Sequence, residues 1–497
     1  MGTVVIAGAG PVGLMLAREL SLAGVEVVLL DKAPQRSGES RAFGIQPRTM
    51  EVLEQRGILD EFIAAGRIAQ MSHFAGLLLD FTALDTRHPA TLILPQTRTE
   101  SILETHLRDV GVSVRWSAEV VGVEQDEHGV TVEVRGADGT IEQVAADYLV
   151  GCDGGRSAVR KLLGIDFPGT PGTLTAMLGD LELADPPEHV IYMQRSEYGQ
   201  FSVLHQDTGA WRVMTVEYDR VTDRNAPMSL EDLRTALVRM AGTDFGMNDP
   251  HWLSRFTDSA RQAADYRRGR VLLAGDAAHI HHPSGGQGLN LGVQDAVNLG
   301  WKLALVCRGQ APDELLDSYV AERHPVAERV VENTRAQTAL SRPDRHTEAL
   351  REVFTHLIGF TEVNQYLSGM ISALDLRYPI GDPATRHPLV GHRVPDADLK
   401  TTAGDTRVFT LLHKGRGVLL CLDPDATTAL AEAAGGWLDR ADVVSARTDP
   451  DAWSIPIGGV VPAPAAVLVR PDGYVAWTGT DPASLRAALG TWFGPAH

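Results

Sequence analysis

Short apolar runs alternate along the chain with longer stretches that have helical spacing. Residues 3–7 (TVVIA) are apolar or β-branched throughout, as expected for a strand buried on both faces of a parallel sheet. A glycine-rich turn at residues 8–13 (GAGPVG) follows, then an amphipathic stretch that ends at Gly24 and a second apolar run at residues 25–30. The pattern predicts a complete βαβ unit with a tight strand-to-helix turn.

The same buried-strand pattern returns at residues 148–150 (YLV) and 270–274 (RVLLA). Alternating positions predict strands within 112–123, 130–135 and 141–150. Helical spacing predicts further helices at about 47–57, at 96–108 with Thr99 as a possible N-cap, at 159–163, at 289–308, at 311–333 and within 342–378.

The pattern and composition of the sequence change at two places along the chain. Residues 170–265 contain alternating strands and one helix near 230–241, which indicates a mixed β-sheet domain inserted into the α/β domain. Residues 381–392 are rich in proline and glycine and form a predicted linker. The α/β domain therefore comprises 1–169 and 266–380, and residues 393–497 form a small α/β domain of their own.

Composition narrows the function. A chain of 497 residues predicts two or three domains, and a formal net charge of -19 argues against nucleic acid as a partner. The three cysteines form no CxxC pair, which fits a reducing compartment. We find no signal peptide and no apolar run long enough for a membrane span, so we expect a cytoplasmic protein.

The first glycine motif carries chemistry. Gly8, Gly10 and Gly13 form GxGxxG between strand and helix, where backbone N–H groups can bind a pyrophosphate, and Asp31 ends the second strand, where it can bind ribose hydroxyls. Strand, helix, second strand and acid all agree, which favours a dinucleotide site over a structural turn. The motif alone does not choose between NAD and FAD.

Two later motifs complete an ordered set: CDGGRSAVR follows the strand at 148–150, and GDAAHIHHP follows the strand at 270–274. With RAFGIQPRTMEVLEQRG, LPQTRTESILETHL and GQGLNLGVQDAVNLGWKLA, the whole chain resembles the class A flavoprotein aromatic monooxygenases, the p-hydroxybenzoate hydroxylase-like group. Within that group it is most similar to the aromatic polyketide hydroxylases of angucycline and anthracycline type. Three motifs in order are much more specific than any one alone.

The resemblance implies a Rossmann-like FAD domain, a substrate-binding β-sheet domain at 170–265 and a thioredoxin-like C-terminal domain. It implies a monooxygenase that consumes NADPH or NADH and molecular oxygen and hydroxylates a polycyclic aromatic polyketide through a flavin C4a-hydroperoxide. We expect a monomer or a homodimer. The alternatives are a flavin reductase or dehydrogenase of the same fold, a non-catalytic flavin-binding regulator, and an NAD-dependent dehydrogenase, which would have no use for the two later motifs.

The resemblance also implies the residues that bind the cofactor. The glycine motif would hold the pyrophosphate, Asp31 the adenosine ribose, Arg41 and Gln96 the phosphate and ribityl portions, and Asp276 a ribityl hydroxyl. The complete predicted set is Gly8, Gly10, Pro11, Val12, Gly13, Asp31, Lys32, Arg41, Gln96, Asp153, Arg156, Asp276, Pro283, Gly286, Gly288, Leu289 and Asn290.

Plainer roles stay open for several of these residues. Arg41 could be a solvated surface arginine, Gln96 could only begin a helix, and Arg160, in the same motif as Asp153 and Arg156, could only pair with an acid. Asp153 and Asp276 each follow a buried strand, where ligands gather in open α/β sheets, so a binding role is favoured for both.

The chemistry adds two expectations. Reduced flavin is anionic near N1 and C2=O, and the N-terminus of the helix that starts near Leu289 would stabilise that charge. Arg377 is our candidate for a substrate-facing cation, with an interdomain salt bridge as its alternative. His279, His281 and His282 lack acidic or cysteine partners at metal-ligand spacing, so we predict no metal.

Overall fold

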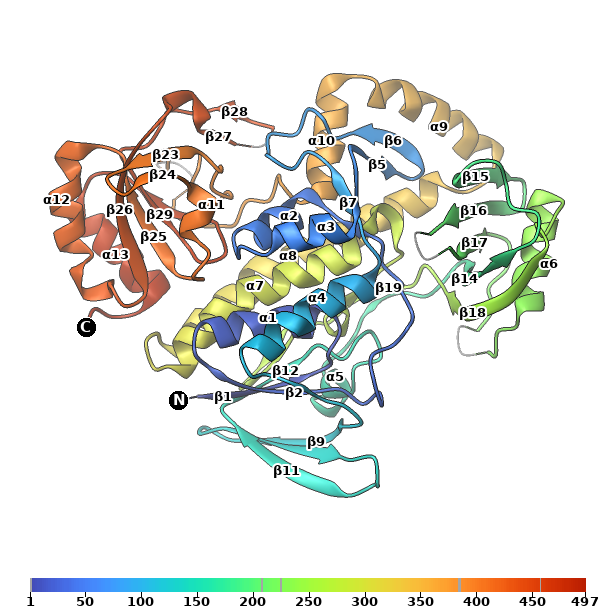
Figure 1. The fold of residues 1–497 in the computed structure, drawn as a ribbon, viewed down its shortest axis with the longest axis horizontal. Helices are drawn as coiled ribbons and strands as arrows, with labels where there is room; N and C mark the ends of the chain where they lie inside the picture. The colour runs from blue at the N-terminus through green and yellow to red at the C-terminus, as the bar shows by residue number, and fades with distance from the viewer. Residues whose placement is uncertain (1, 207–208, 224–225, 383–385, 456) are drawn as a thin grey trace.

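A six-stranded, mostly parallel sheet forms the centre of the molecule (Figure 1). The computed structural model describes residues 2–206, 209–223, 226–382, 386–455 and 457–497. The strand at Thr3–Ala7 is flanked by two parallel neighbours. Its valines and isoleucine are fully buried, as the apolar run predicts. In sheet order the strands are β20 (Arg267–Arg268), β21 (Val271–Leu273), β12 (Tyr148–Gly151), β1 (Thr3–Ala7), β2 (Glu26–Leu30) and β8 (Val114–Arg115).

The order of these strands brings the three motifs together. The glycine motif follows β1, CDGGRS follows β12 and GDAAH follows β21, and the three strands are parallel neighbours. Their carboxyl ends therefore meet at one edge of the sheet, where ligands bind in open α/β folds.

The two helices that follow the first and third motifs lie side by side over one face of this sheet, and a small antiparallel sheet lies on its opposite side (Figure 1). The second of them is almost entirely buried and begins two residues before the predicted Leu289. The predicted helix at 311–333 is instead a short 3-10 turn followed by a helix that continues to Leu340 through Pro325. The helices are α1 (Pro11–Leu22), α2 (Pro47–Glu54), α3 (Leu59–Ala65), α4 (Gln96–Asp109), α5 (Ala158–Leu162), α7 (Gln287–Cys307) and α8 (Asp317–Leu340).

Thr99 is not the N-cap of α4. The helix begins three residues earlier, and the hydroxyl of Ser40 accepts a hydrogen bond from the Gln96 N–H at 2.8 Å. A loop that is distant in sequence thus supplies the capping oxygen, so no local cap was needed in the helix's own sequence.

Several smaller sheets accompany the central six-stranded sheet. Three of them are β9 (Glu119–Gln125), β10 (Val130–Arg135) and β11 (Ile141–Ala146); β3 (Gly44–Ile45), β7 (Thr91–Ile93) and β4 (Arg67–Ala69); and the hairpin β5 (Met71–Phe74) and β6 (Leu77–Asp80). A fourth joins β13 (Gly169–Thr170), β19 (Ala260–Gln262) and β22 (His279–Ile280). The base of the inserted region is thereby hydrogen-bonded to the segment that follows GDAAH.

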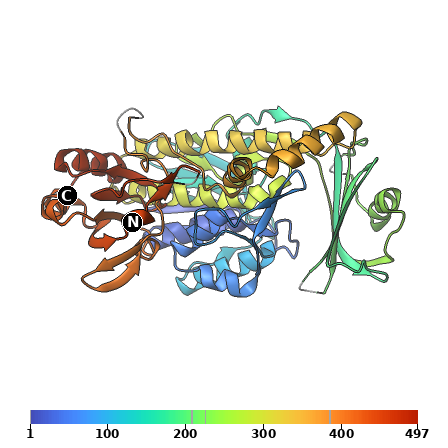
Figure 2. The same ribbon diagram turned by 90° about the horizontal axis from the view of Figure 1, so that it is seen from above.

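The inserted region is a five-stranded sheet with one helix. Every pairing in it is antiparallel, so the expectation of a mixed sheet is wrong. Two hairpins join the strands from Ile191 to Glu217, a longer connection precedes them, and the helix provides the crossover between two strands that run in the same direction on either side of a third. Its helix covers the face turned away from the FAD domain (Figure 2). In sheet order the strands are β15 (Ile191–Ser196), β16 (Gly199–His205), β17 (Trp211–Glu217), β14 (Thr175–Leu183) and β18 (Met247–Phe256), and the helix is α6 (Leu230–Ala241).

Residues 342–378 contain two helices, α9 (Arg345–Ile358) and α10 (Thr361–Ser372), separated at Gly359 and Phe360. The predicted linker at 381–392 includes 383–385, which lie outside the described residues. No helix in the described part of the chain is long and apolar enough to cross a membrane.

A third domain at the C-terminus contains a mixed sheet (Figure 1). Its central strand pairs in parallel with one neighbour and antiparallel with the other. In sheet order the strands are β24 (Gly404–Arg407), β23 (Asp398–Thr401), β26 (Ala441–Thr448), β25 (Gly417–Cys421), β29 (Ala466–Val469) and β30 (Val475–Thr478), with the hairpin β27 (Ser454–Ile455) and β28 (Gly459–Val460) and the helices α11 (Val408–Leu411), α12 (Pro424–Ala433) and α13 (Pro482–Phe493).

Candidate cofactor and active site

The glycine motif leaves the N-terminus of α1 open. The helix begins at Pro11 with Gly10 as N-cap, and no side chain caps it, so its first N–H groups are available to an anion. Gly8 has a φ of +106°, and a methyl group there would overlap the carbonyl of Cys152. A methyl group on Gly13 would overlap the carbonyl oxygen of Gly8. A methyl group on Gly10 would meet no protein atom within 4 Å. The chain thus packs tightly behind the turn and leaves space in front of it, with Val12 packed below.

Asp31, which directly follows β2, accepts two backbone hydrogen bonds, one of them from the glycine turn. Its Oδ2 accepts a hydrogen bond from the Ala9 N–H at 2.8 Å, and its Oδ1 accepts one from the Ala33 N–H at 2.9 Å. A carboxylate has about four acceptor positions, so capacity for ribose hydroxyls remains. The neighbouring Lys32 is exposed.

The loop that carries Arg41 meets the start of α4. Gln96 accepts a hydrogen bond from the Ala42 N–H through Oε1 at 3.3 Å and donates one from Nε2 to Glu100 at 2.8 Å. Arg41 itself is exposed and pairs with Glu39 at 2.9 Å. The structure therefore brings Arg41 and Gln96 to one place, with the Arg41 side chain directed to solvent.

The second motif is built around Asp153 and Arg160. Oδ2 of Asp153 accepts from the N–H groups of Ala158 (2.6 Å) and Val159 (3.2 Å) in α5, while its buried Oδ1 has no protein partner. Arg156 is exposed. Arg160 is 4% exposed and donates to the carbonyl oxygen of Ala277 at 2.7 Å, so it joins the second motif to the third. Among the described residues no carboxylate lies within 4.0 Å of its guanidinium, which lies 3.7 Å from the centre of the Phe167 ring.

Asp276 comes shortly after β21, at the edge of the sheet where the three motifs meet. Its side chain is accessible to solvent, yet protein atoms surround it closely. This desolvation raises the pKa of Asp276, and the nearby His279 and Arg41 only partly oppose it. A carboxyl that is both accessible and closely surrounded lies in a recess, as a ligand of a ribityl hydroxyl would.

A buried ion pair, which we did not predict, holds the backbone beside Asp276. Oδ2 of Asp295 accepts from the Gly275 N–H at 3.1 Å and contacts Nε2 of His279 at 2.7 Å, and its Oδ1 accepts from Nε of Arg323 at 2.7 Å. Asp295 and Arg323 are completely buried. The only signal for this ion pair in the sequence was that charged side chains occupy positions within the helical periods of α7 and α8.

The loop before α7 is held by Asn290 and Gln46. Asn290 accepts from the Gln46 N–H at 2.8 Å and donates to the carbonyl oxygens of Gly44 (2.9 Å) and Gly286 (2.8 Å). Gln46 donates to the carbonyl oxygen of Gly285 at 3.1 Å. The side chain of Gln46 is 2% exposed, and sequence reasoning missed its role, although it lies within the quoted motif RAFGIQPRTM.

The open face of this loop is suited to a flavin ring. Pro283 and Gly286 are exposed, Gly288 and Leu289 are half-buried, and no side chain caps α7, so its first N–H groups face open space. A helix of 21 residues directs the positive end of its dipole to that point. A flavin ring held against this loop would have the negative charge of its reduced form stabilised by these N–H groups.

The three histidines do not form a metal site. His279 is bound to Asp295, Nδ1 of His281 contacts the carbonyl oxygen of His282 at 2.8 Å, and Nδ1 of His282 contacts the Ser284 hydroxyl at 2.7 Å. Burial lowers the pKa of His281 and of His282 to about 4, so both are neutral at pH 7. Across the part of the chain that the structure describes, no three His, Cys, Asp or Glu side chains are grouped to hold a metal ion.

The inserted sheet presents a second wall opposite the FAD domain. One of its faces packs on α6, and the other faces the FAD domain (Figure 2). By strand register, Leu178, Met214 and Ser202 lie in one row on that second face. The hydroxyl of Ser202 is buried without a protein partner, as is Nε2 of His282, whose ring lies 6.0 Å from that of Phe256. The wall thus combines apolar side chains and unsatisfied polar atoms with the buried ion pair of Asp180 and Arg212, whose atoms lie 2.8 Å apart.

Arg377 lies on the connection between α10 and the C-terminal domain. It is exposed, and its Nε donates to the carbonyl oxygen of Val390 at 3.2 Å. Burial of part of the side chain and the charge of Arg386 lower its pKa. Neither the substrate-facing role nor the interdomain salt bridge is decided by these contacts, and the role of Arg377 stays a prediction.

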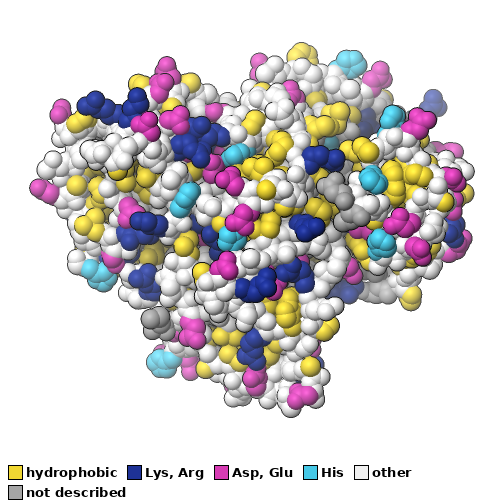
Figure 3. All heavy atoms as spheres, in the orientation of Figure 1, with side chains coloured by type: hydrophobic (Ala, Val, Ile, Leu, Met, Phe, Trp, Pro, Cys, Tyr) yellow, Lys and Arg dark blue, Asp and Glu magenta, His cyan; other side chains and the backbone are white. Residues whose placement is uncertain are grey.

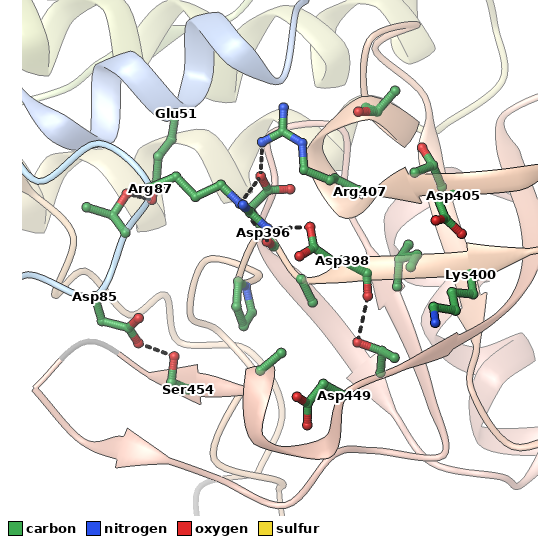
Figure 4. Close-up of a pocket in the computed structure, with 18 of the residues that line it drawn as sticks. Glu51, Asp85, Arg87, Asp396, Asp398, Lys400, Asp405, Arg407, Asp449 and Ser454 are labelled. Carbon is green, nitrogen blue, oxygen red and sulfur yellow. Dashed lines mark hydrogen bonds and ion pairs between the residues drawn. The ribbon is translucent and has the colours of Figure 1, made fainter.

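A large hollow among the described residues lies elsewhere. A cavity of about 1100 Å³ separates the FAD domain from the C-terminal domain (Figure 4). Ion pairs line it, among them Arg87 with Asp398 at 2.5 Å and Arg407 with Asp396 at 2.5 Å. None of the predicted cofactor residues lines it.

Acidic and basic side chains are interspersed over the visible surface, without a broad basic field (Figure 3).

Taken together, the site fits FAD. An open helix N-terminus, an acid at the end of the second strand, a recessed carboxyl and a second open helix N-terminus follow one another along the sheet edge. Gly10 follows β1 and Asp153 follows β12, two parallel neighbouring strands whose carboxyl ends lie at this edge. The fold and the site define a flavoprotein of the Rossmann-like class.

Known proteins agree with this assignment. An FAD-binding domain family matches residues 1–334, and the family described as the C-terminal domain of aromatic-ring hydroxylases matches 387–496. The chain belongs to the FAD-binding aromatic-ring hydroxylases. The 12-dehydrotetracycline 5-monooxygenase/anhydrotetracycline 6-monooxygenase of Streptomyces rimosus is 48% identical over 99% of both chains.

Solved structures give the same result. The anhydrotetracycline hydroxylase from Streptomyces rimosus has a TM-score of 0.92 at 47% identity, and an aromatic hydroxylase from angucycline biosynthesis has a TM-score of 0.90 at 43% identity, each over 100% of both chains. The expectations of FAD as cofactor and of a flavin-dependent aromatic monooxygenase are therefore confirmed. The NAD-dependent dehydrogenase alternative is wrong.

Proposed function

We propose that this flavin-dependent monooxygenase hydroxylates a polycyclic aromatic polyketide, using NADPH or NADH as the electron donor and molecular oxygen as the oxygen source. The observation that carries the proposal is the apolar pair of Leu178 and Met214 on the face of the inserted sheet that is turned toward the FAD domain (Figure 2). A flat fused-ring substrate can pack against such side chains, and exclusion of water there favours oxygen transfer over its loss as peroxide. Relatives named for tetracycline and angucycline substrates support the same class.

Within this proposal the chain's own residues have separate tasks. The N-termini of α1 and α7 bind the pyrophosphate and the anionic end of the ring system, while Asp31 and Asp276 hold hydroxyls. FAD, when bound, supplies the reduction and oxygen chemistry. The predicted set from Gly8 to Asn290 surrounds it, and Arg377 contributes a cation on the substrate side.

We further propose that His282 and Ser202 bind polar groups of the substrate. Each has a buried polar atom without a protein partner, Nε2 and Oγ respectively. A buried polar atom left unpaired costs about 1–3 kcal/mol, and a substrate hydroxyl or carbonyl would remove that cost. Neutral His282 can donate or accept, according to its tautomer.

We propose a thioredoxin-like architecture for the C-terminal domain. Its supporting features are the order β26-β25-β29-β30, the parallel β25–β26 pair linked through α12, and the final α13. Cys421 is buried, and burial raises its pKa to about 11, which argues against disulfide exchange. We also propose the domain division 1–169 with 266–380, 170–265 and 393–497, a cytoplasmic location, and a monomer or homodimer.

The test is NAD(P)H oxidation by the FAD-loaded protein with anhydrotetracyclines, angucyclinones and anthracyclinones under ¹⁸O₂. We expect one compound to stimulate oxidation and to gain one ¹⁸O atom by mass spectrometry. Stimulated oxidation that yields only hydrogen peroxide with every compound would overturn the polyketide assignment. His282→Ala and Ser202→Ala should raise KM more than they lower kcat, because they remove binding contacts and not the oxygen chemistry.

A further inference from the structure

A tight turn of the C-terminal domain is buried inside the FAD domain. The turn joins β29 to β30 and comprises residues 470–474 (RPDGY), which we call the docking turn; all five residues are buried. Turns normally lie on the surface, where water satisfies their polar backbone groups. This turn must find those partners within the protein.

Helices of the FAD domain supply the partners. Arg48 in α2 donates to the carbonyl oxygen of Asp472 at 2.8 Å, and Arg56, just after α2, donates to that of Pro471 at 2.9 Å. Glu322 in α8 accepts two hydrogen bonds from Arg470, at 2.6 and 2.8 Å. The docking turn is therefore fastened to α8 and to α2, the helix that follows the segment with Arg41 and Gln46.

Aromatic rings continue the path toward the cofactor. The ring of Tyr474 in the docking turn packs against that of Tyr378, with ring centres 4.2 Å apart and a tilt of 36° between the planes. The Tyr378 hydroxyl accepts a hydrogen bond from Nη1 of Arg323 at 3.0 Å. Arg323 is bound to Asp295, which accepts from the Gly275 N–H beside Asp276. All links of this chain are buried.

The ionisation of Asp295, the last side chain in this path, is sensitive to the position of Arg323. Burial alone would raise the pKa of Asp295, but the charges of Arg323 and His279 and their hydrogen bonds overcome that effect and lower it. Arg323 and His279 together thus favour the ionised form of Asp295. The Tyr378 hydroxyl is one of three groups that fix this guanidinium, with Asp295 and the carbonyl oxygen of Leu291.

We propose that Tyr378 and Tyr474 are positioning residues for FAD: the docking turn sets Tyr378, Tyr378 sets Arg323, and Arg323 with Asp295 sets the backbone at Gly275 and Asp276. The C-terminal domain, which has no CxxC pair, therefore acts on the cofactor site through packing and not through redox chemistry. This inference depends on FAD binding alone and is independent of which substrate is hydroxylated.

The test uses the full-length protein with Tyr378→Phe, which keeps the ring and removes the hydroxyl. We expect the dissociation constant for FAD to rise roughly tenfold, as for loss of one hydrogen bond to a charged group. Amide hydrogen exchange of the apo protein over residues 271–280 should accelerate, while exchange in β16 and β17 of the inserted sheet should not change. Tyr366→Phe, on the exposed side of α10, is the matched control and should change neither.

A double-mutant cycle tests the order of the chain. Tyr474→Leu should also weaken FAD binding, and the double variant with Tyr378→Phe should bind no more weakly than the weaker single variant, because both act through Arg323. Additive losses would overturn the path through Tyr378. If Tyr474→Leu does not fold, Tyr378→Phe decides: an unchanged FAD dissociation constant or unchanged exchange at 271–280 would refute the proposal.

Discussion

Asn290 and Gln46 are 244 positions apart, yet the side-chain oxygen of Asn290 accepts a hydrogen bond from the Gln46 N–H at 2.8 Å in the buried core of the site. Together they tie the segment before α2 to the loop before α7. The open N-terminus of α7 depends on this contact, because the same Asn290 side chain also holds Gly44 and Gly286.

Asn290→Ala removes all three hydrogen bonds and leaves a buried backbone N–H unpaired. We expect the free energy of unfolding to fall by about 2 kcal/mol and FAD binding to weaken roughly tenfold. Chemical denaturation and FAD titration by quenching of flavin fluorescence measure the two effects. Asn248→Ala, at an exposed position of β18, should leave both unchanged. An Asn290→Ala protein that binds FAD as tightly as the parent contradicts the assignment.

Gly10 and Gly13 should respond differently to the same substitution. Gly13→Ala places a methyl group against the carbonyl oxygen of Gly8, so the apo protein should lose about 1–3 kcal/mol of stability. Gly10→Ala meets open space in the protein, so the apo protein should keep its stability and lose affinity for FAD by more than about tenfold. Thermal unfolding of both apo proteins, followed by FAD titration, separates the two. Equal destabilisation by the two substitutions would be the contrary result.

Stability should fall as pH decreases below neutrality. Burial lowers the pKa of His282 and of His392 from the usual 6.5 to about 4; for His392 the charges of Arg377 and Arg393 add to the effect. The folded state keeps both neutral while the unfolded chain takes up protons, so this stability is complete above pH 6.5 and is lost as pH falls toward 4. Each histidine contributes a slope of about 1.4 kcal/mol per pH unit within that window.

His392→Gln tests this slope. Between pH 6.5 and 5.5, above the main range of carboxyl titration, its unfolding free energy should depend less steeply on pH than that of the parent protein. His128→Gln, at an exposed position, should leave the slope unchanged. Identical slopes for His392→Gln and the parent would show that His392 is not held neutral in the fold.

A buried ion pair between Glu19 and Arg56 supports the docking turn. Arg56 donates to the two carboxylate oxygens of Glu19, each at 2.7 Å. Glu19→Leu leaves the Arg56 charge buried without its partner and should cost about 3–5 kcal/mol. The double variant Glu19→Leu/Arg56→Met should be more stable than Glu19→Leu, as denaturant unfolding can show. A double variant that is less stable would mean that Arg56 acts chiefly through its bond to Pro471.

The local pattern of the sequence predicted the parts of the fold that depend on neighbouring residues. Apolar runs marked β1, β12 and β21, and the motifs after them marked the sheet edge where FAD binds. Gly8 and Gly13 were recognisable because only glycine can fit against the backbone that lies behind the turn. Helix caps were less predictable: α4 begins at Gln96 as predicted, but the distant Ser40 and not Thr99 accepts the hydrogen bond from its first N–H.

The sequence by itself determined the three motifs, their order and hence the family, because each motif is a local strand-to-loop transition. Only the tertiary structure decided which buried polar groups meet. Gln46 with Asn290, Arg323 with Asp295 and the docking turn with Glu322 each join residues from different elements. Such pairs form because a buried charge or N–H must find a partner wherever packing places one, and no local periodicity records that choice.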